Sequence, residues 1–152
     1  MSRARWRLAL SSGSIMSRTS PHGPPVAGRA RPLVLVADDD ADLRGYVAAS
    51  LAKDGRADVV EAASGAVALT IARALRPDLV VSDLAMPGLD GAALCHALHL
   101  DPVTRGVPVL IVSGATRSPP WADGFLAKPF NAAALRTEAD RLLARPPAAP
   151  AL

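Results

Sequence analysis

The stretch LVLVADDD, residues 33–40, places five consecutive apolar residues directly before three aspartates. An apolar run of this length is typical of a strand that is buried on both faces, as strands of parallel sheets are. Similar short runs occupy residues 57–60, 78–82, 107–112 and 124–127. The sequence therefore predicts five strands that form one parallel sheet.

Helical patterns occupy most of the intervals between these strands and also follow the last one. Apolar residues recur there at helical spacing, as Leu43/Val47/Leu51, Val67/Ile71/Leu75, Leu94/Leu98 and Leu135/Ala139/Leu142. Ser64 and Asn131 are the expected N-caps of the second and the last helix, and Pro77 ends the second. Strands that alternate with helices predict an α/β fold with a parallel sheet.

The interval between the fourth and fifth strands is unusually short. It holds ten residues, 114–123, whereas the other three intervals hold 17 to 23. A crossover that includes a helix takes at least ~10–12 residues, and Pro119-Pro120 interrupts this one. The fourth helix is therefore expected to be shortened, remade as a turn, or absent.

Charge separates a basic N-terminal segment from a mildly acidic remainder. Residues 1–31 contain six arginines and no acid, whereas residues 32–152 contain 11 basic and 14 acidic residues. The composition of residues 1–31 predicts a disordered basic tail, in which Trp6–Leu10 is the only apolar stretch. Residues 146–152, with three prolines, predict a frayed C-terminal tail. The folded domain is expected to span residues 32–145, with no output domain after it.

Several classes of protein are excluded by what the chain lacks. No apolar run approaches the ~20 residues of a membrane span. The single Cys95 excludes an internal disulfide framework and a Cys-rich zinc site, and a free thiol suits the cytoplasm. We expect Cys95 to be a small core residue and His96 and His99 to be surface residues. Trp121 either covers the sheet edge or is exposed for a partner.

Polar residues follow the carboxyl ends of four predicted strands, where parallel sheets hold their ligands. They are Asp38-Asp39-Asp40, Asp83, Ser113 and Lys128. Clustered carboxylates repel one another unless a cation lies among them, and a set of oxygens alone suits Mg²⁺. Lys128 can hold an oxyanion, while Ser113 and its neighbour Gly114 leave room for a group the size of phosphate.

Two other acids have simpler interpretations. Asp40 is expected to begin a helix, where a negative charge interacts well with the positive helix end, rather than to bind metal. Asp90 precedes Gly91 and is expected to serve a turn or a cap. Met86-Pro87-Gly88 is interpreted as a turn that shapes the loop after Asp83.

Four spaced segments together resemble the response-regulator receiver domains of bacterial two-component signalling. They are LVLVADDD at 33–40, SDLAMPGLDG at 82–91, IVSGA at 111–115 and GFLAKPF at 124–130. They occur in the order of that family, and the resemblance covers about residues 32–145. It implies a flavodoxin-like, doubly wound fold with a five-stranded parallel sheet in the order 2-1-3-4-5.

The resemblance also implies a metal site and a phosphoacceptor. Asp83 matches the aspartate that accepts a phosphoryl group. Asp39 and Asp83 would bind Mg²⁺ directly, together with the backbone carbonyl of Ala85. Asp38 would act mainly through a metal-bound water.

Three further positions match residues that recognise the phosphoryl group or respond to it. Ser113 would hydrogen-bond to the group and Lys128 would pair with it. Phe125 matches the aromatic residue whose rotamer follows phosphorylation, although it lacks a hydroxyl. The Lys128–Pro129 bond is expected to be cis, which X-Pro bonds tolerate.

The expected function is a phosphorylation-dependent switch of a two-component phosphorelay. A sensor histidine kinase or a phosphotransfer protein would donate the phosphoryl group to Asp83, and an unknown downstream protein would receive the output. The chain is expected to be a monomer that makes no direct contact with DNA. It is not expected to be an enzyme, apart from catalysing its own phosphorylation and dephosphorylation. Two alternatives stay open: a small phosphohydrolase with an aspartate nucleophile at Asp38, and a degenerate receiver that serves only for docking.

Overall fold

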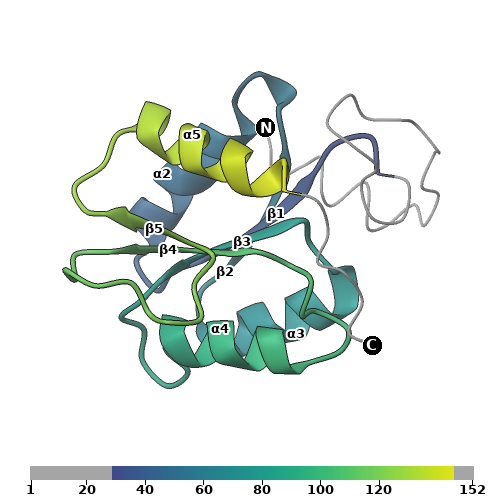
Figure 1. The fold of residues 1–152 in the computed structure, drawn as a ribbon. Coiled ribbons are helices and arrows are strands. Elements are labelled where there is room, and N and C mark those ends of the chain that lie inside the picture. Colours follow the sequence, from purple (N-terminus) through teal and green to yellow (C-terminus); the bar gives the residue numbers. More distant parts are fainter. Residues whose placement is uncertain (1–28, 146–152) are drawn as a thin grey trace.

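Five parallel strands form the centre of the computed structural model, which describes residues 29–145 (Figure 1). Their bounds are β1 (Leu33–Ala37), β2 (Asp58–Ala62), β3 (Leu79–Asp83), β4 (Val109–Ser113) and β5 (Gly124–Ala127). The strand order β2-β1-β3-β4-β5 confirms the expected topology. Most of the predicted basic tail and all of the predicted C-terminal tail lie outside the described residues.

Helices cover both faces of the sheet, as Figure 1 shows. One face carries α2 (Ala41–Ala52), which a short 3₁₀ turn η2 (Lys53–Gly55) follows, and α5 (Ala132–Leu143). The other face carries α3 (Gly65–Leu75) and α4 (Gly91–Leu100). No helix within residues 29–145 has the length and apolar character needed to cross a membrane.

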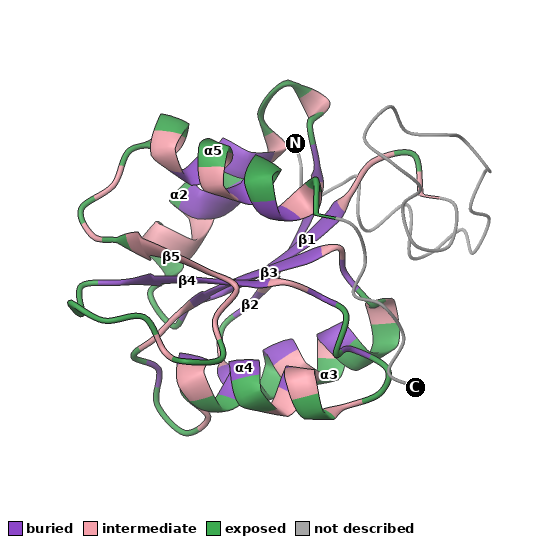
Figure 2. Ribbon diagram, viewed as in Figure 1, coloured by how far each residue is buried: buried purple, intermediate pink, exposed green. Residues whose placement is uncertain are grey.

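The three central strands β1, β3 and β4 are apolar along most of their length because both of their faces are covered. Leu35, Val80 and Ile111 belong to the core cluster on the side of α3 and α4. Val34 and Val81, their neighbours in sequence, belong to the cluster on the side of α2 and α5. Figure 2 shows the central strands buried almost without interruption. Continuous apolar runs, rather than alternating ones, are what a doubly covered parallel sheet requires.

Side-chain caps begin the helices. Ser64 accepts a hydrogen bond from the backbone N–H of Val67, and Asn131 accepts one from Ala134, so both predicted N-caps are confirmed. Asp40 caps α2 and Asp90 caps α4 in the same way. Because their carboxylates satisfy N–H groups that would otherwise lack a partner, both acids serve helix ends.

Strands β1 and β5 lie where the sequence indicates, whereas the bounds of β2, β3 and β4 lie one or two residues later. The strands expected at 78–82 and 107–112 are Leu79–Asp83 and Val109–Ser113. The reason is pairing in the sheet, since Asp83 lies opposite Val112 and Ser113 lies opposite Ala127. Asp83 and Ser113 therefore occupy the last positions of their strands instead of the loops that follow.

The crossover between β4 and β5 contains no helix. Residues 114–123 form bends and a turn, which confirms that this crossover departs from the usual βαβ pattern. The backbone N–H of Asp123 donates to the carbonyl of Val109 over 2.9 Å and so brings the segment back to the sheet. Ten residues with two adjacent prolines leave no room for a helix that keeps its backbone hydrogen bonds.

Three residues of α4, Cys95, His96 and His99, contact this crossover. Cys95 is fully buried, as expected, and burial raises the pKa of its thiol to about 12. His96 is exposed and its ring stacks on that of Trp121, which is half exposed. The side chain of His99 is 23% exposed and contacts Asp123, so His99 lies at the surface and is partly covered by the crossover.

Candidate functional site

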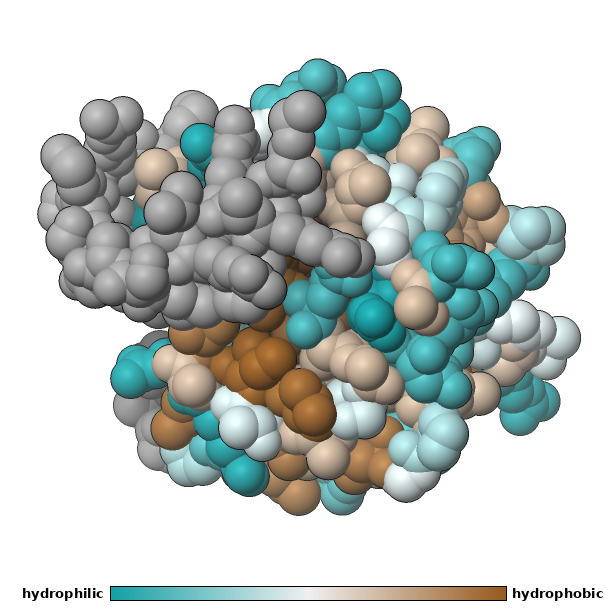
Figure 3. Space-filling view, turned by 180° about the vertical axis from the view of Figure 1, so that it is seen from behind, coloured by the Kyte–Doolittle hydropathy of each residue, from teal (hydrophilic) through white to brown (hydrophobic). Residues whose placement is uncertain are grey.

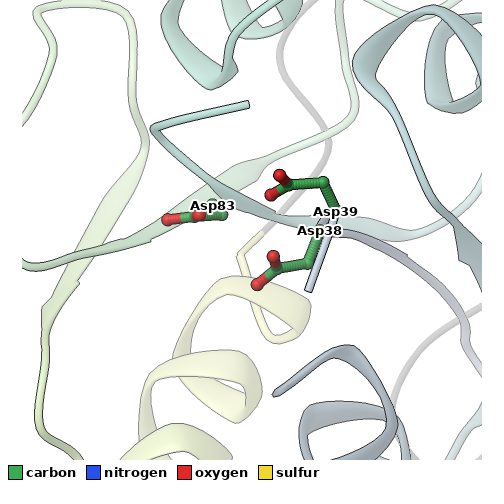
Figure 4. A group of neighbouring side chains, drawn as sticks. All are labelled: Asp38, Asp39 and Asp83. Atoms are coloured by element: carbon green, nitrogen blue, oxygen red, sulfur yellow. The ribbon is translucent and has the colours of Figure 1, made fainter. Parts of the chain in front are cut away.

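Three carboxylates meet at the carboxyl edge of the sheet. Asp38 and Asp39 directly follow β1, and Asp83 ends the neighbouring strand β3. One oxygen from each carboxylate lies within 4.8 Å of the others. Figure 4 shows the side chains of Asp38 and Asp39 directed toward Asp83. The sheet thus joins acids that are more than 40 residues apart in the chain.

The cluster carries an electrostatic cost that a cation would relieve. Burial raises the pKa of Asp38, which is 5% exposed, and the negative charges of Asp83 and Asp39 raise it further. The backbone N–H of Asp40, which donates to Asp38 Oδ1 over 2.9 Å, and the charge of Lys128 act in the opposite direction. Oxygen ligands without histidine or cysteine fit a hard divalent cation such as Mg²⁺.

Lys128 supplies a positive charge at the same edge. Its Nζ donates to Asp83 Oδ1 over 3.2 Å, and the backbone N–H of Leu84 donates to the same oxygen over 2.9 Å. The backbone N–H of Lys128 also donates to the carbonyl of Ser113, so the end of β5 is fixed against the end of β4. The Lys128–Pro129 peptide bond is cis, as expected.

The remaining residues expected at the site lie around this edge. Ser113 is buried at the end of β4, where its Oγ accepts a hydrogen bond from the backbone N–H of Ala115. Ala85 is exposed in the loop that follows Asp83. Phe125 lies in β5 opposite Ile111 and packs, partly buried, against the core cluster on the side of α3 and α4.

Arg44 is a site residue that the sequence reasoning missed. From α2, its Nη1 donates to the backbone carbonyl of Asp38 over 2.8 Å, while its Nε pairs with Glu61 Oε1 over 3.2 Å. It therefore fixes the backbone that presents the first acid of the cluster. The available signal was an arginine six residues after Asp38, just inside a helix that Asp40 caps.

Gly91 is a second residue whose role only the fold makes evident. A Cβ at this position would lie 2.2 Å from the carbonyl oxygen of Asp83. The backbone N–H of Gly91 donates to the carbonyl of Leu84 over 2.9 Å, which closes the loop of residues 84–90 onto the end of β3. Only glycine allows this approach, and the loop that carries Ala85 depends on it.

Curated proteins are similar to this chain in sequence. MtrA of Mycobacterium tuberculosis (strain H37Rv), named a DNA-binding response regulator, is 36% identical over 108 residues, which cover 66% of this chain and 46% of MtrA. RpaA of Synechocystis, named a DNA-binding dual master transcriptional regulator, is 31% identical over 121 residues, covering 75% of this chain and 50% of RpaA. The chain thus spans about half the length of the curated relatives it matches.

Solved structures of response regulators resemble this chain in fold. The chemotaxis response regulator CheY4 of Vibrio cholerae superimposes with a TM-score of 0.67 at 31% identity, over 74% of this chain and 98% of CheY4. A putative response regulator from Chloroflexus aurantiacus gives a TM-score of 0.71 at 30% identity, over 76% and 99% of the two chains. Residues 34–140 match the family model of the response regulator receiver domain. This protein therefore belongs to the receiver-domain family of two-component response regulators.

Proposed function

We propose that this receiver domain accepts a phosphoryl group on Asp83. The observation that carries the proposal is the contact of 3.2 Å between Lys128 Nζ and Asp83 Oδ1, beside two further carboxylates. Carboxylate nucleophiles form covalent intermediates of this kind, and the Lys128 ammonium group holds the Asp83 carboxylate at the edge of the sheet. The same ammonium group lies where it can neutralise charge on an incoming phosphoryl group.

The geometry favours Asp83 over Asp38 as the nucleophile. Asp38 is the more buried of the two and burial raises the pKa of its carboxyl, whereas Asp83 lies beside the ammonium group of Lys128. The Oδ1 atom of Asp38 is already engaged by the backbone N–H of Asp40. These properties argue against a phosphohydrolase that would use Asp38. The complete acidic set with Lys128 argues against a receiver that serves only for docking.

The transfer step follows from the atoms at the site. Among the described residues, the hydrogen bonds to the Asp83 carboxylate go to Oδ1, so Oδ2 is the oxygen open to a phosphorus atom. Oδ2 forms the new P–O bond while the P–N bond to a donor phosphohistidine breaks, and the electron pair of that bond remains on the donor imidazole. Lys128 Nζ and the Ser113 hydroxyl then donate to the phosphoryl oxygens.

Mg²⁺ is the cofactor that this set of ligands fits. Asp39, Asp83 and the backbone carbonyl of Ala85 would hold the ion directly, and Asp38 would hold it through water. When bound, the ion supplies charge neutralisation for the transferred group.

The partners of this step are proteins. A sensor histidine kinase or a phosphotransfer protein in the cytoplasm donates the phosphoryl group. The state of Asp83 reaches a downstream protein through Ser113 and the packing of Phe125, and the receiver domain makes no direct contact with DNA.

Phosphorylation with a small donor tests the proposal. The chain is incubated with acetyl phosphate and Mg²⁺, and intact mass is measured in parallel for Asp83→Asn, Asp38→Asn and Asp42→Asn. The parent and Asp42→Asn, which alters an exposed acid of α2, are expected to gain one phosphoryl group. Asp83→Asn is expected to gain none. A label that persists in Asp83→Asn and disappears in Asp38→Asn would establish Asp38 as the nucleophile and overturn the proposal.

A further inference from the structure

Hydrogen bonds hold the backbone of Asp38 on both sides. Its N–H donates to the carbonyl of Ala62 in β2 over 3.1 Å, and its carbonyl accepts a bond from Arg44 Nη1 over 2.8 Å. The backbone N–H of Asp40 holds the carboxylate through Oδ1 over 2.9 Å. Among the described residues, the hydrogen bonds to this carboxylate go to Oδ1, so Oδ2 stays available to a metal-bound water.

The bond from Arg44 also restricts Asp39, because a peptide unit is planar. The carbonyl of Asp38 and the N–H of Asp39 belong to one such unit. A guanidinium that holds this carbonyl therefore limits the direction in which the Asp39 side chain leaves the backbone. Figure 4 shows that the side chains of both acids point toward Asp83. Arg44 thus acts on two of the three acids through the backbone that joins them.

A guanidinium so close to the acids has a cost, because it repels a divalent cation. Glu61 offsets this cost, since its Oε1 accepts a hydrogen bond from Arg44 Nε over 3.2 Å. Glu61 lies in β2 opposite Val36 of β1, so the register of the sheet brings its carboxylate beside the guanidinium. The donors of a guanidinium point in fixed directions. Arg44 can therefore hold a carbonyl and a carboxylate at the same time.

The Arg44–Glu61 pair is largely covered, although water still reaches it. The two side chains are 17% and 16% exposed. Figure 3, drawn from behind, shows hydrophilic side chains on the surface between the layer of α2 and the layer of α3. Salt screens partly buried charges less than fully exposed ones. A change in either charge should therefore be felt at the neighbouring acids and should respond to the salt concentration.

We propose that Arg44 and Glu61 together set the affinity of the acidic cluster for Mg²⁺. Arg44 is the positioning residue for Asp38 and Asp39, and Glu61 cancels the charge that Arg44 brings to the site. Residues that orient metal ligands from outside commonly change metal affinity by about 10–100-fold. The inference rests on the proposed function, because it takes the cluster as the magnesium site.

Calorimetric titration of the full chain with Mg²⁺ tests the proposal through the sign of one effect. Arg44→Ala removes a positive charge, so charge alone would leave the affinity unchanged or raise it. Loss of positioning should instead weaken the affinity by about tenfold. In an Asp39→Asn background the same substitution should have a smaller effect, because one ligand that Arg44 positions is already gone.

Glu61→Gln separates the charge from the positioning. Glutamine keeps an acceptor for Arg44 Nε but leaves the guanidinium charge uncompensated. The Mg²⁺ affinity should fall by about two- to fourfold at low salt, the size of a single charge acting through water. This loss should shrink as NaCl is raised from about 0.05 M to about 0.5 M. Arg56→Ala is the matched control, because Arg56 pairs instead with Asp140 of α5, and it should bind like the parent.

The proposal is overturned if the parent binds Mg²⁺ and Arg44→Ala binds it equally well or better. An effect of Arg44→Ala that is as large without the Asp39 carboxylate, or that Arg56→Ala reproduces, would also overturn it. Circular dichroism confirms that each variant is folded. Should Arg44→Ala fail to fold, Glu61→Gln decides, and an affinity equal to that of the parent at low salt overturns the proposal.

The titration also separates this inference from the proposed function. A parent that binds Mg²⁺ and gains a phosphoryl group, with variants that bind like the parent, would overturn this inference alone. A parent that binds no Mg²⁺ would overturn the magnesium site itself, and this inference with it.

Discussion

The Nε2 atom of His99 lies 3.2 Å from Oδ2 of Asp123, and this contact joins α4 to the helix-free segment before β5. The same carboxylate oxygen accepts the backbone N–H of Val109 over 2.8 Å. The other oxygen lies 3.3 Å from the guanidinium of Arg145, which follows α5. Asp123 therefore fastens residues 114–123 to α4, to β4 and to the end of α5, in place of the contacts that a crossover helix would provide.

Removing this carboxylate should destabilise the domain. Asp123→Ala is expected to lower the free energy of unfolding by about 1–3 kcal/mol, because the N–H of Val109 loses its side-chain acceptor. Arg145→Ala should cost less than about 1 kcal/mol, because half-exposed ion pairs contribute little. Urea unfolding monitored by circular dichroism measures both. Equal losses in the two variants would show that the ion pair, and not the bond to Val109, carries the effect.

The missing crossover helix should prevent dimerisation through that face. A stable interface buries about 800 Å² per partner, and residues 114–123 form no helix that could offer such a surface. The chain is expected to stay monomeric with and without a phosphoryl mimic, up to high micromolar concentrations, in sedimentation velocity. A shift to dimer on activation that Arg117→Glu abolishes would show that the segment still forms the interface, since Arg117 is exposed there.

Substitution of Asp39 should lower the affinity for Mg²⁺, whereas substitution of Lys128 should not. Asp39→Asn removes an oxygen ligand from the cluster and should weaken Mg²⁺ binding about tenfold or more in isothermal titration calorimetry. Lys128→Ala should leave the affinity unchanged or raise it, because a competing cation next to Asp83 is gone. Asp42→Asn serves as the control and should bind like the parent. The opposite order of affinities would contradict this assignment.

The raised pKa of Asp38 should make the stability of the metal-free domain depend on pH. The ionised carboxylate is disfavoured in the folded state, so the parent loses stability as pH rises from the unfolded value near 4 through the folded pKa. Asp38→Asn has no charge to bury and keeps an acceptor for the Asp40 N–H. In the presence of a metal chelator, the free energy of unfolding of Asp38→Asn should exceed that of the parent by a margin that grows over this pH interval and then levels off. An advantage that is constant with pH, or that shrinks, would contradict burial as the cause.

The sequence by itself determined the elements whose signals are local. Apolar runs located the five strands, and Ser64 and Asn131 located two helix starts through hydrogen bonds that span three residues. The carboxyl ends of parallel strands meet at one edge, so the nearness of Asp38, Asp39 and Asp83 also followed from the pattern. The count of ten residues indicated that residues 114–123 depart from an ordinary crossover.

Contacts between distant elements were decided only by the tertiary structure. The bond from Arg44 to the Asp38 carbonyl, the pairing of His99 with Asp123 and the hold of Arg29 on the end of α3 each depend on how a helix is rotated and where its neighbour lies. Periodicity fixes which residues share a helix face, but the packing of that face against the sheet sets the direction of each long side chain. Residues far apart in the sequence meet only once that packing is complete.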